Sequence, residues 1–219
     1  MPKAIVLFSG GIDSTTALYW AIDQGFDVIA LTFNYPGRAQ QELQATRRIA
    51  HAVKAQYIEA SLPFLQSATD LLSCDPNAFK GIKVPEGYIP TRNLIFYALA
   101  AYYSEVYDAK YIIAGHLETD SIGFPDATPA FFQAIESIIN MMELNQENTS
   151  HRQMLLPFLT KTKTEVIRLA VQLKVPLELT WSCYYDNLVH CENCESCWER
   201  EEAFDQAEIN DPLKNQFFS

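Results

Sequence analysis

Residues 9–16 read SGGIDSTT and directly follow AIVLF, an apolar run with the length and composition of a buried strand. Gly10 and Gly11 permit backbone conformations that are closed to other residues, so the amides of this turn can approach a ligand closely. From Asp13 onward, apolar residues recur at helical spacing, and a helix N-terminus carries partial positive charge. A strand, a glycine turn and a helix N-terminus together predict an anion site, and phosphate is the anion we expect.

The turn differs from the common phosphate-binding loops in one respect. It has no lysine, so it matches neither GxxxxGK[ST] nor GxGxxG. Glycine and serine also mark ordinary turns, so the alternative is a plain turn in which Asp13 or Ser14 only caps the helix.

Four of the five cysteines form a second candidate site with the spacing C-x7-C-x2-C-x2-C: Cys183, Cys191, Cys194 and Cys197. Cytosolic proteins rarely keep disulfides, and thiolates at this spacing suit tetrahedral coordination of zinc. Four ligands close the coordination sphere, which predicts a structural metal site. The sequence from Cys194 reads as a helix that places two of the thiols one turn apart, and His190 is expected outside the ligand set. Reduced or redox-active thiols are the alternative.

The elements that must position these residues alternate between strand and helix. Strand patterns occur at about 4–8, 27–35, 57–62 and 110–115, and helical patterns begin near residues 13, 40, 93, 129 and 160. This alternation predicts parallel βαβ units in a doubly wound α/β sheet, whose ligands bind beyond the carboxyl ends of the strands. Residues 63–88 are rich in proline, glycine and polar residues, so we expect an irregular segment that acts as a mobile lid or substrate loop.

Composition narrows the functional classes. The 219 residues are 48% hydrophobic and 20% charged, as in a globular protein with one substantial core. No apolar run reaches the roughly 18 residues of a membrane span, so we expect a cytoplasmic protein without membrane contact. The formal net charge of −11 would repel a phosphate backbone, so nucleic acid is not an expected partner.

The segment Ser9 to Ser14 resembles the SGGxDS signature of the PP-loop ATP pyrophosphatases, which split ATP between its α and β phosphates. Together with the cysteines it resembles one branch, the 7-cyano-7-deazaguanine synthase (QueC or ExsB) family, over nearly the whole chain. The likeness includes FNYPGR (33–38), IPTRN (89–93), AGHLETDSIGFPD (114–126) and PFLTKTKTE (157–165). It implies a PP-loop domain of Rossmann-like, HUP-type fold over 1–180 and a small zinc-binding helical segment packed on it over 181–219.

The resemblance also implies an activity. Members are ATP-dependent ligases of queuosine biosynthesis that convert 7-carboxy-7-deazaguanine and ammonia into the nitrile. The carboxylate becomes an acyl adenylate, ammonia gives the amide, and a second ATP activates the amide oxygen so that dehydration yields the nitrile. The implied cofactors are ATP, Mg²⁺ and Zn²⁺, and the implied assembly is a homodimer.

Site residues follow from the same resemblance. The ATP-binding residues would be Phe8, Ser9, Gly10, Gly11, Ile12, Asp13, Ser14, Thr15 and Arg38. The catalytic residues would be Asp13, Ser14, Arg92 and Lys163, of which the two cations would neutralise charge that develops on the phosphates. The deazaguanine would contact Arg92, Asn93, Glu118, Thr119, Asp120, Phe124 and Asp126.

The chain departs from the family pattern at several positions. The family loop usually reads ETDFSGYPDCRDEF, whereas residues 118–131 read ETDSIGFPDATPAF, so that Ala127 and Thr128 replace a cysteine and an arginine. An arginine there is a natural partner for a carboxylate. Gly37 and Ala39 likewise replace a glutamine and a histidine. An alternative is therefore a paralogue that transfers the adenylated acid to another amine.

Two further alternatives remain open. A tRNA-thiolating enzyme shares the SGGxDS turn, but such enzymes commonly use mid-chain cysteines, and this chain has none between Asp75 and Ser182. A non-catalytic nucleotide sensor would also share the turn, although the combination of that turn with Lys163 argues against it.

Overall fold

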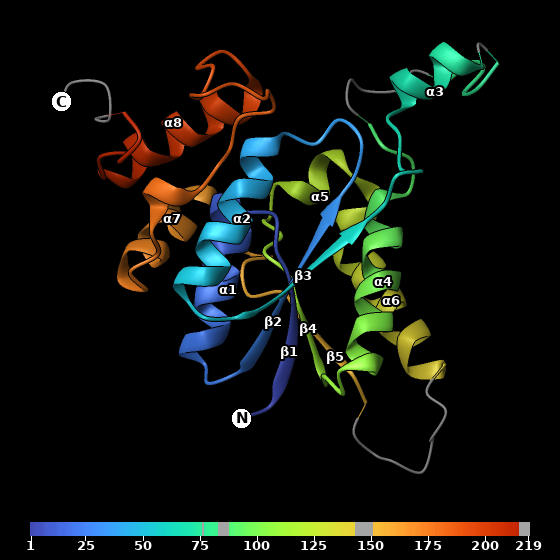
Figure 1. Cartoon of the computed structure of the whole chain (residues 1–219), viewed down its shortest axis with the longest axis horizontal. Coiled ribbons are helices and arrows are strands. Elements are labelled where there is room, and N and C mark those ends of the chain that lie inside the picture. Colours follow the sequence, from blue (N-terminus) through green and yellow to red (C-terminus); the bar gives the residue numbers. More distant parts are fainter. Residues whose placement is uncertain (76, 83–87, 143–150, 215–219) are drawn as a thin grey trace.

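The computed structural model describes residues 1–75, 77–82, 88–142 and 151–214. Strands and helices alternate along most of the chain (Figure 1). The strands are β1 Lys3–Leu7, β2 Asp27–Asn34, β3 Gln56–Ser61, β4 Tyr111–Ile113 and β5 Gln153–Leu155. The α-helices are α1 Ile12–Asp23, α2 Gln40–Ala52, α3 Ala68–Cys74, α4 Arg92–Val106, α5 Asp120–Gly123, α6 Pro129–Met141, α7 Lys163–Gln172 and α8 Glu195–Ala207; Pro125–Ala127 and Leu177–Leu179 form short 3-10 helices.

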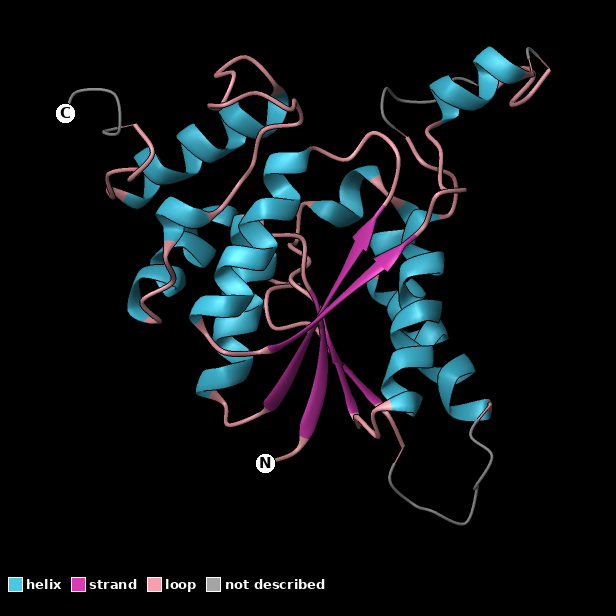
Figure 2. Ribbon diagram, in the orientation of Figure 1, coloured by secondary structure: helices cyan, strands magenta, loops and turns pink. Residues whose placement is uncertain are grey.

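The strands form one parallel sheet in the order β3-β2-β1-β4-β5. The central strand β1 pairs on both sides, since Ala4 lies opposite Val28 of β2 and Tyr111 of β4. The strand order reverses between β1 and β4, and the carboxyl ends of strands at such a switch point enclose a ligand crevice. In Figure 2 the arrowheads of β2 and β3 show the direction of these ends. The predicted doubly wound α/β sheet is confirmed.

Alternating side chains of β1 contact two separate apolar cores. Ala4 and Val6 are fully buried in one core with α1, α2, α7 and α8, whereas Ile5 is buried in the other with α4 and α6. Figure 1 shows α1, α2 and α7 on one side of the sheet and α4 and α6 on the other. Because both faces are covered, the strands read as apolar runs rather than as an apolar and polar alternation.

The C-terminal helix α8 belongs to the first of these cores through Ala203, Phe204 and Ala207. The side chain of Arg200 is buried beside it, where Nε and Nη2 donate to the two carboxylate oxygens of Asp211 at 2.6 and 2.8 Å. This bidentate ion pair and the apolar contacts fix the segment that carries the cysteines against the rest of the molecule.

Most of the expected elements lie within one or two residues of their predicted bounds, but one prediction is wrong in part and one strand was missed. Residues 63–88 are not irregular throughout, because α3 lies within them and begins with a capping box between Ser67 and Asp70. The prediction of a mobile lid is untested there, since residues 76 and 83–87 lie outside the described part. Strand β5 was not predicted, because three residues at the edge of a sheet carry little periodic signal. In the described part of the chain, no helix is both long and apolar enough to cross a membrane.

Candidate active site and metal centre

The turn after β1 is held in shape by its own serines. Ser14 Oγ accepts a hydrogen bond from the Ser9 amide at 3.1 Å and lies 2.9 Å from Ser9 Oγ, and it donates to the Gly11 carbonyl at 3.2 Å. Gly11 is the N-cap of α1 and has no side chain that could occupy the end of the helix. The first amides of α1 therefore have no side-chain cap from Gly11, and the anion site predicted from the order of strand, turn and helix stays a prediction.

Gly10 is required at its position for two reasons. Its φ of +88° lies in the left-handed region, and a Cβ there would lie 2.9 Å from the Glu42 carbonyl oxygen and 3.1 Å from Thr46 Cγ2. The Gly10 carbonyl accepts a hydrogen bond from the Trp181 amide at 3.0 Å. The turn therefore packs directly on α2 and on the segment that leads to the cysteines.

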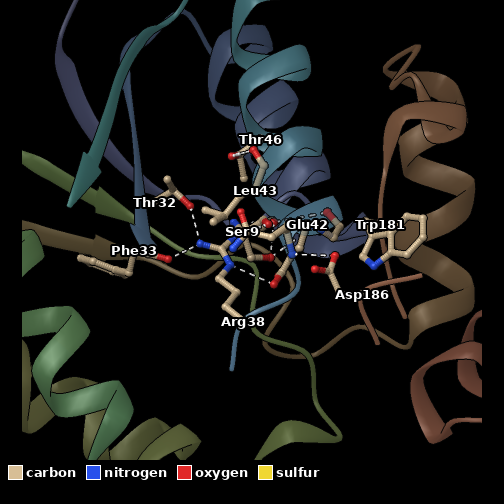
Figure 3. A network of polar contacts seen from close by, with 12 residues as sticks. Ser9, Thr32, Phe33, Arg38, Glu42, Leu43, Thr46, Trp181 and Asp186 are labelled. Atoms are coloured by element: carbon tan, nitrogen blue, oxygen red, sulfur yellow. Dashed lines mark hydrogen bonds and ion pairs between the residues drawn. The ribbon is translucent and has the colours of Figure 1, made fainter. Parts of the chain in front are cut away.

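Arg38 lines the site but is largely buried, and its guanidinium is hydrogen-bonded to the turn and to β2 (Figure 3). Its side chain is 3% exposed, and it donates to Ser9 O at 2.7 Å, to Thr32 Oγ1 at 2.9 Å and to the carbonyl oxygen of Phe33. Its Nε pairs with Glu42 at 2.9 Å. The guanidinium thus ties the turn to the carboxyl end of β2 and to α2. Its proposed role in ATP binding stays a prediction, and these contacts show how it shapes the backbone that would bind the phosphates.

Asp13 and Lys163 join the turn to α7. A capping box of Thr162 and Glu165 starts that helix and places Lys163 at its first position, where Nζ forms an ion pair with Asp13 Oδ2. The other oxygen, Asp13 Oδ1, is buried and has no hydrogen-bond partner among the described residues. An orphaned buried carboxylate oxygen is costly, and a bound cation or donor would satisfy it.

A cavity of about 320 Å³ opens beside the turn, at the carboxyl ends of β1, β2 and β4. Phe8, Ser9, Gly11, Asp13 and Ser14 line it from the turn, and Arg38, Arg92, Asn93 and Asp120 line it from elsewhere. Lys163 does not line the cavity itself, but it forms an ion pair with Asp13, which does. The sites predicted for an anion and for an organic substrate are therefore adjacent.

Other predicted residues lie outside the lining. Ile12 and Thr15 are buried under the turn, and Gly10 packs on α2. Glu118, Thr119 and Phe124 are exposed on the loop after β4, whereas Asp126 is half-buried. The Asp126 carbonyl accepts a hydrogen bond from Asn93 Nδ2 at 3.0 Å, which ties this loop to α4.

An aromatic wall of the cavity was not singled out from the sequence. It consists of Phe33 and Tyr35 at the end of β2 and Phe96 and Tyr97 on α4; the rings of Phe33 and Phe96 stack with centroids 4.2 Å apart. Aromatic residues at the end of an apolar strand were the available signal. Arg92 lies near this wall, since its charge acts to lower the pKa of Tyr35. Burial of Tyr35 is the larger effect, so the pKa of Tyr35 is raised.

His116 is another lining residue that the sequence reasoning missed. Its Nδ1 lies 3.3 Å from Asp120 Oδ2, which also accepts a hydrogen bond from the Leu117 amide at 3.0 Å. Burial alone would raise the pKa of Asp120, but these two hydrogen bonds outweigh it and hold the pKa below its usual value. The sequence shows that His116 and Asp120 are four residues apart. It does not show that their loop packs beside the glycine turn.

The four predicted cysteines converge. Their sulfurs all lie within 4.8 Å of one another, and Cys191 Sγ lies 3.9 Å from Cys197 Sγ. Four thiolates around zinc, with Zn–S bonds of about 2.3 Å, lie about 3.8 Å apart in a tetrahedron, so the residues present fit this metal. The Asn193 amide donates to Cys191 Sγ, and this bond is the leading cause that lowers the pKa of that thiol to about 7.

His190 does not belong to this cluster. Its ring stacks on Trp181 with centroids 4.3 Å apart, and its Nε2 accepts a hydrogen bond from the Ser182 amide at 3.0 Å. Burial, followed by the charge of Arg200, lowers its pKa to about 4. A neutral imidazole thus packs between the cysteines and the glycine turn.

Comparisons with known proteins were made for the whole chain. A model of the family described as "Queuosine biosynthesis protein QueC" matches residues 3–208. The chain is 37% identical to a 7-cyano-7-deazaguanine synthase from Clostridium kluyveri, with 98% of each chain covered. It is 38% identical to a protein of the same name from Aliarcobacter butzleri, with 99% of this chain and 96% of the relative covered.

Solved structures show the same fold at low identity. A predicted subunit of tRNA methyltransferase from Methanocaldococcus jannaschii aligns with a TM-score of 0.52 and 16% identity, covering 78% of this chain and 75% of the other. A U34-tRNA thiolase from Methanococcus maripaludis aligns with a TM-score of 0.51 and 15% identity, covering 94% and 64%. By the match to the family model and by its full-length relatives, the chain belongs to the QueC family of queuosine biosynthesis proteins.

Proposed function

We propose that this protein is an ATP-dependent ligase that makes 7-cyano-7-deazaguanine from 7-carboxy-7-deazaguanine and ammonia. One observation carries the proposal: the glycine turn and the ion pair of Asp13 with Lys163 lie at one side of a cavity with an aromatic wall, in a chain of the QueC family. An anion site beside a purine-sized space is the arrangement that adenylation of a flat heterocyclic acid requires.

The turn residues would bind the phosphates of ATP. The amides at the start of α1 would face the pyrophosphate that leaves when the acyl adenylate forms, and Lys163 would stay close enough to share its charge between Asp13 and the phosphates. The aromatic wall of Phe33 and Phe96 offers the apolar faces that purine-like rings pack against.

Mg²⁺ fits this site because Asp13 Oδ1 is buried and has no partner among the described residues. When bound, the ion would supply positive charge to the phosphate oxygens. Asp13 would hold it, and Lys163 would fix the orientation of the carboxylate.

Arg92 is our candidate partner for the substrate carboxylate. Ala127 and Thr128 occupy positions where the family has cysteine and arginine, and both have structural roles here. Ala127 is buried in the apolar core and is 1% exposed. Thr128 is the N-cap of α6, and its Oγ1 accepts a hydrogen bond from the Phe131 amide at 3.3 Å. Arg92, at the first turn of α4, lines the cavity and supplies a cation in their place. Of the three acids expected to read the base, Asp120 lines the cavity; base reading by Glu118 and Asp126 stays a prediction.

The four cysteines would hold a structural zinc ion, and the homodimer implied by the resemblance stays a prediction for sedimentation analysis. The activity is tested by incubating the protein with ATP, Mg²⁺, ammonium and 7-carboxy-7-deazaguanine, and measuring pyrophosphate and the nitrile by mass spectrometry. We expect both products. Pyrophosphate without amide or nitrile would favour a paralogue that uses another amine, and no pyrophosphate would exclude adenylation of this acid.

A further inference from the structure

We propose that His116, oriented by Asp120, is the general base that removes protons from the substrate nitrogen during the amide-forming and nitrile-forming steps. The proposal rests on the proposed function and adds a residue role to it. His116 would be the catalytic residue, whereas Asp120 acts through it as a positioning residue.

The geometry gives the imidazole a defined tautomer. Asp120 Oδ2 accepts a hydrogen bond from the Leu117 amide and lies 3.3 Å from Nδ1 of His116. An ionised carboxylate can only accept hydrogen bonds. Nδ1 of His116 must therefore carry the proton that is donated to Asp120. The lone pair of the neutral ring then resides on Nε2. The ring is held between apolar neighbours, with its centroid 4.8 Å from that of Phe132 and 6.1 Å from that of Tyr97.

A second polar group near His116 lacks a partner. Tyr97 lines the cavity and is 1% exposed, and its buried hydroxyl has no hydrogen-bond partner among the described residues. Burial and then the charge of Asp120 raise the pKa of Tyr97, so the hydroxyl stays protonated and can donate or accept. A substrate polar group in front of His116 would supply the missing partner.

Elimination among the titratable lining residues points to the same group. Asp13 is paired with Lys163, and Arg38 is paired with Glu42. Arg92 stays charged, and burial raises the pKa values of Tyr35 and Tyr97. Three other titratable groups interact with the charge of Asp120. They are Tyr97 from α4, Lys163 from α7 and Glu199 from α8. Among the described lining residues, His116 supplies the imidazole, the side chain most often used as a general base.

The proton balance of the reaction requires such a base twice. When ammonia attacks the acyl adenylate, a C–N bond forms, the C–O bond to AMP breaks with its electron pair on AMP, and the nitrogen must lose one proton. In the second stage the amide oxygen attacks the α-phosphorus of ATP, pyrophosphate leaves, and the nitrogen lone pair forms a C=N bond. The adenylated amide then loses two protons from nitrogen: one N–H electron pair forms the third C–N bond, the other becomes the nitrogen lone pair, and AMP leaves with the C–O electron pair. His116 Nε2 would accept these protons in turn and release them to solvent. Adenylation itself needs no proton transfer from nitrogen.

The test separates these steps with His116→Asn, which keeps an N–H donor toward Asp120 but has no basic nitrogen. Exchange of labelled pyrophosphate into ATP, in the presence of 7-carboxy-7-deazaguanine, measures adenylation; mass spectrometry measures amide and nitrile. We expect exchange within about 3-fold of wild type and product formation lowered by at least about 100-fold, the range of general acid–base catalysis. Asp120→Asn should show the same selectivity with a smaller loss. The matched control is His51→Asn, at an exposed histidine of α2, which should leave both rates unchanged.

The pH profile gives a readout that a structural role would not change. The rate advantage of wild type over His116→Asn should shrink toward acid pH, because the wild-type base becomes protonated while the variant has no such group. A constant ratio at all pH values, or an equal loss of exchange and of product formation, would overturn the assignment. If wild type gives neither exchange nor product with this acid, the proposed function fails; if wild type makes the nitrile and His116→Asn matches it, only the role of His116 fails.

Discussion

Replacing Gly115 by alanine tests whether the loop after β4 holds the glycine turn in its working position. Gly115 packs against the backbone of α1, and an added Cβ would lie 2.6 Å from the Asp13 carbonyl oxygen and 2.7 Å from its carbon. Both atoms are main chain, so the clash cannot be relieved by rotating a side chain. The two segments must separate by about 0.8 Å to restore an ordinary contact of 3.4 Å. Overpacking of this kind costs about 1–3 kcal/mol of folding free energy.

The activity should fall further than the stability suggests. A displacement of about 1 Å at groups that align reacting atoms lowers rates by about 100-fold, so we expect a loss near that size in pyrophosphate exchange. Urea unfolding monitored by circular dichroism measures the stability of the same sample. The matched control is Gly25→Ala, where φ is +81° and a Cβ meets no atom within 4 Å. Its left-handed backbone costs a similar 1–2 kcal/mol, roughly, without moving the turn. Exchange within about 3-fold of wild type in folded Gly115→Ala protein would refute the reasoning.

Three other perturbations have defined outcomes. Ser14→Ala leaves the Ser9 amide without its acceptor, so pyrophosphate exchange should fall by about 100-fold with a melting temperature close to that of wild type; full exchange would contradict the assigned turn. The purified protein should contain about one zinc ion per chain by atomic emission, and Cys194→Ser should lose the metal and melt earlier; equal metal content in the variant would argue against this ligand. Arg200 outweighs the effect of burial and holds the pKa of Asp211 below its usual range, so the stability that Asp211 contributes is present above its unfolded pKa of about 3.9 and is lost as the pH falls through the lower folded value. Asp211→Asn should therefore be less stable at neutral pH and should lose less stability on acidification below about pH 4, and parallel urea midpoints from pH 7 to pH 2 would disprove this linkage.

Local signals predicted the parts of the site whose chemistry is contained in one segment. The strand, the glycine turn and the helix N-terminus are adjacent in sequence, so periodicity and glycine placement were sufficient to predict an anion site. The cysteines were equally visible, because three of them lie within seven residues and their spacing is typical of a zinc site.

Contacts between segments that are distant in the sequence could not be predicted from local sequence patterns. The resemblance implied Arg38 as an ATP-binding residue, and the sequence did not predict that its guanidinium also donates to main-chain oxygens of β2 and of the turn. The predicted contact of Asp120 with a base stays a prediction, and its hydrogen bonds with His116 and Leu117 were not predicted from the sequence. Such partners are decided by the strand order, which a single sequence constrains only to a few topologies.

The hydrogen bond from the Trp181 amide to the Gly10 carbonyl has a consequence for biosynthesis of the chain. The turn leaves the ribosome before its hydrogen-bond partner Trp181, which is translated about 170 positions later. Contacts of such long sequence separation form slowly, because loop closure must precede them. Nascent chains that stop before this tryptophan should therefore already contain every residue of the turn and still lack a stable phosphate site, so nucleotide binding should begin only after Trp181 has left the ribosome.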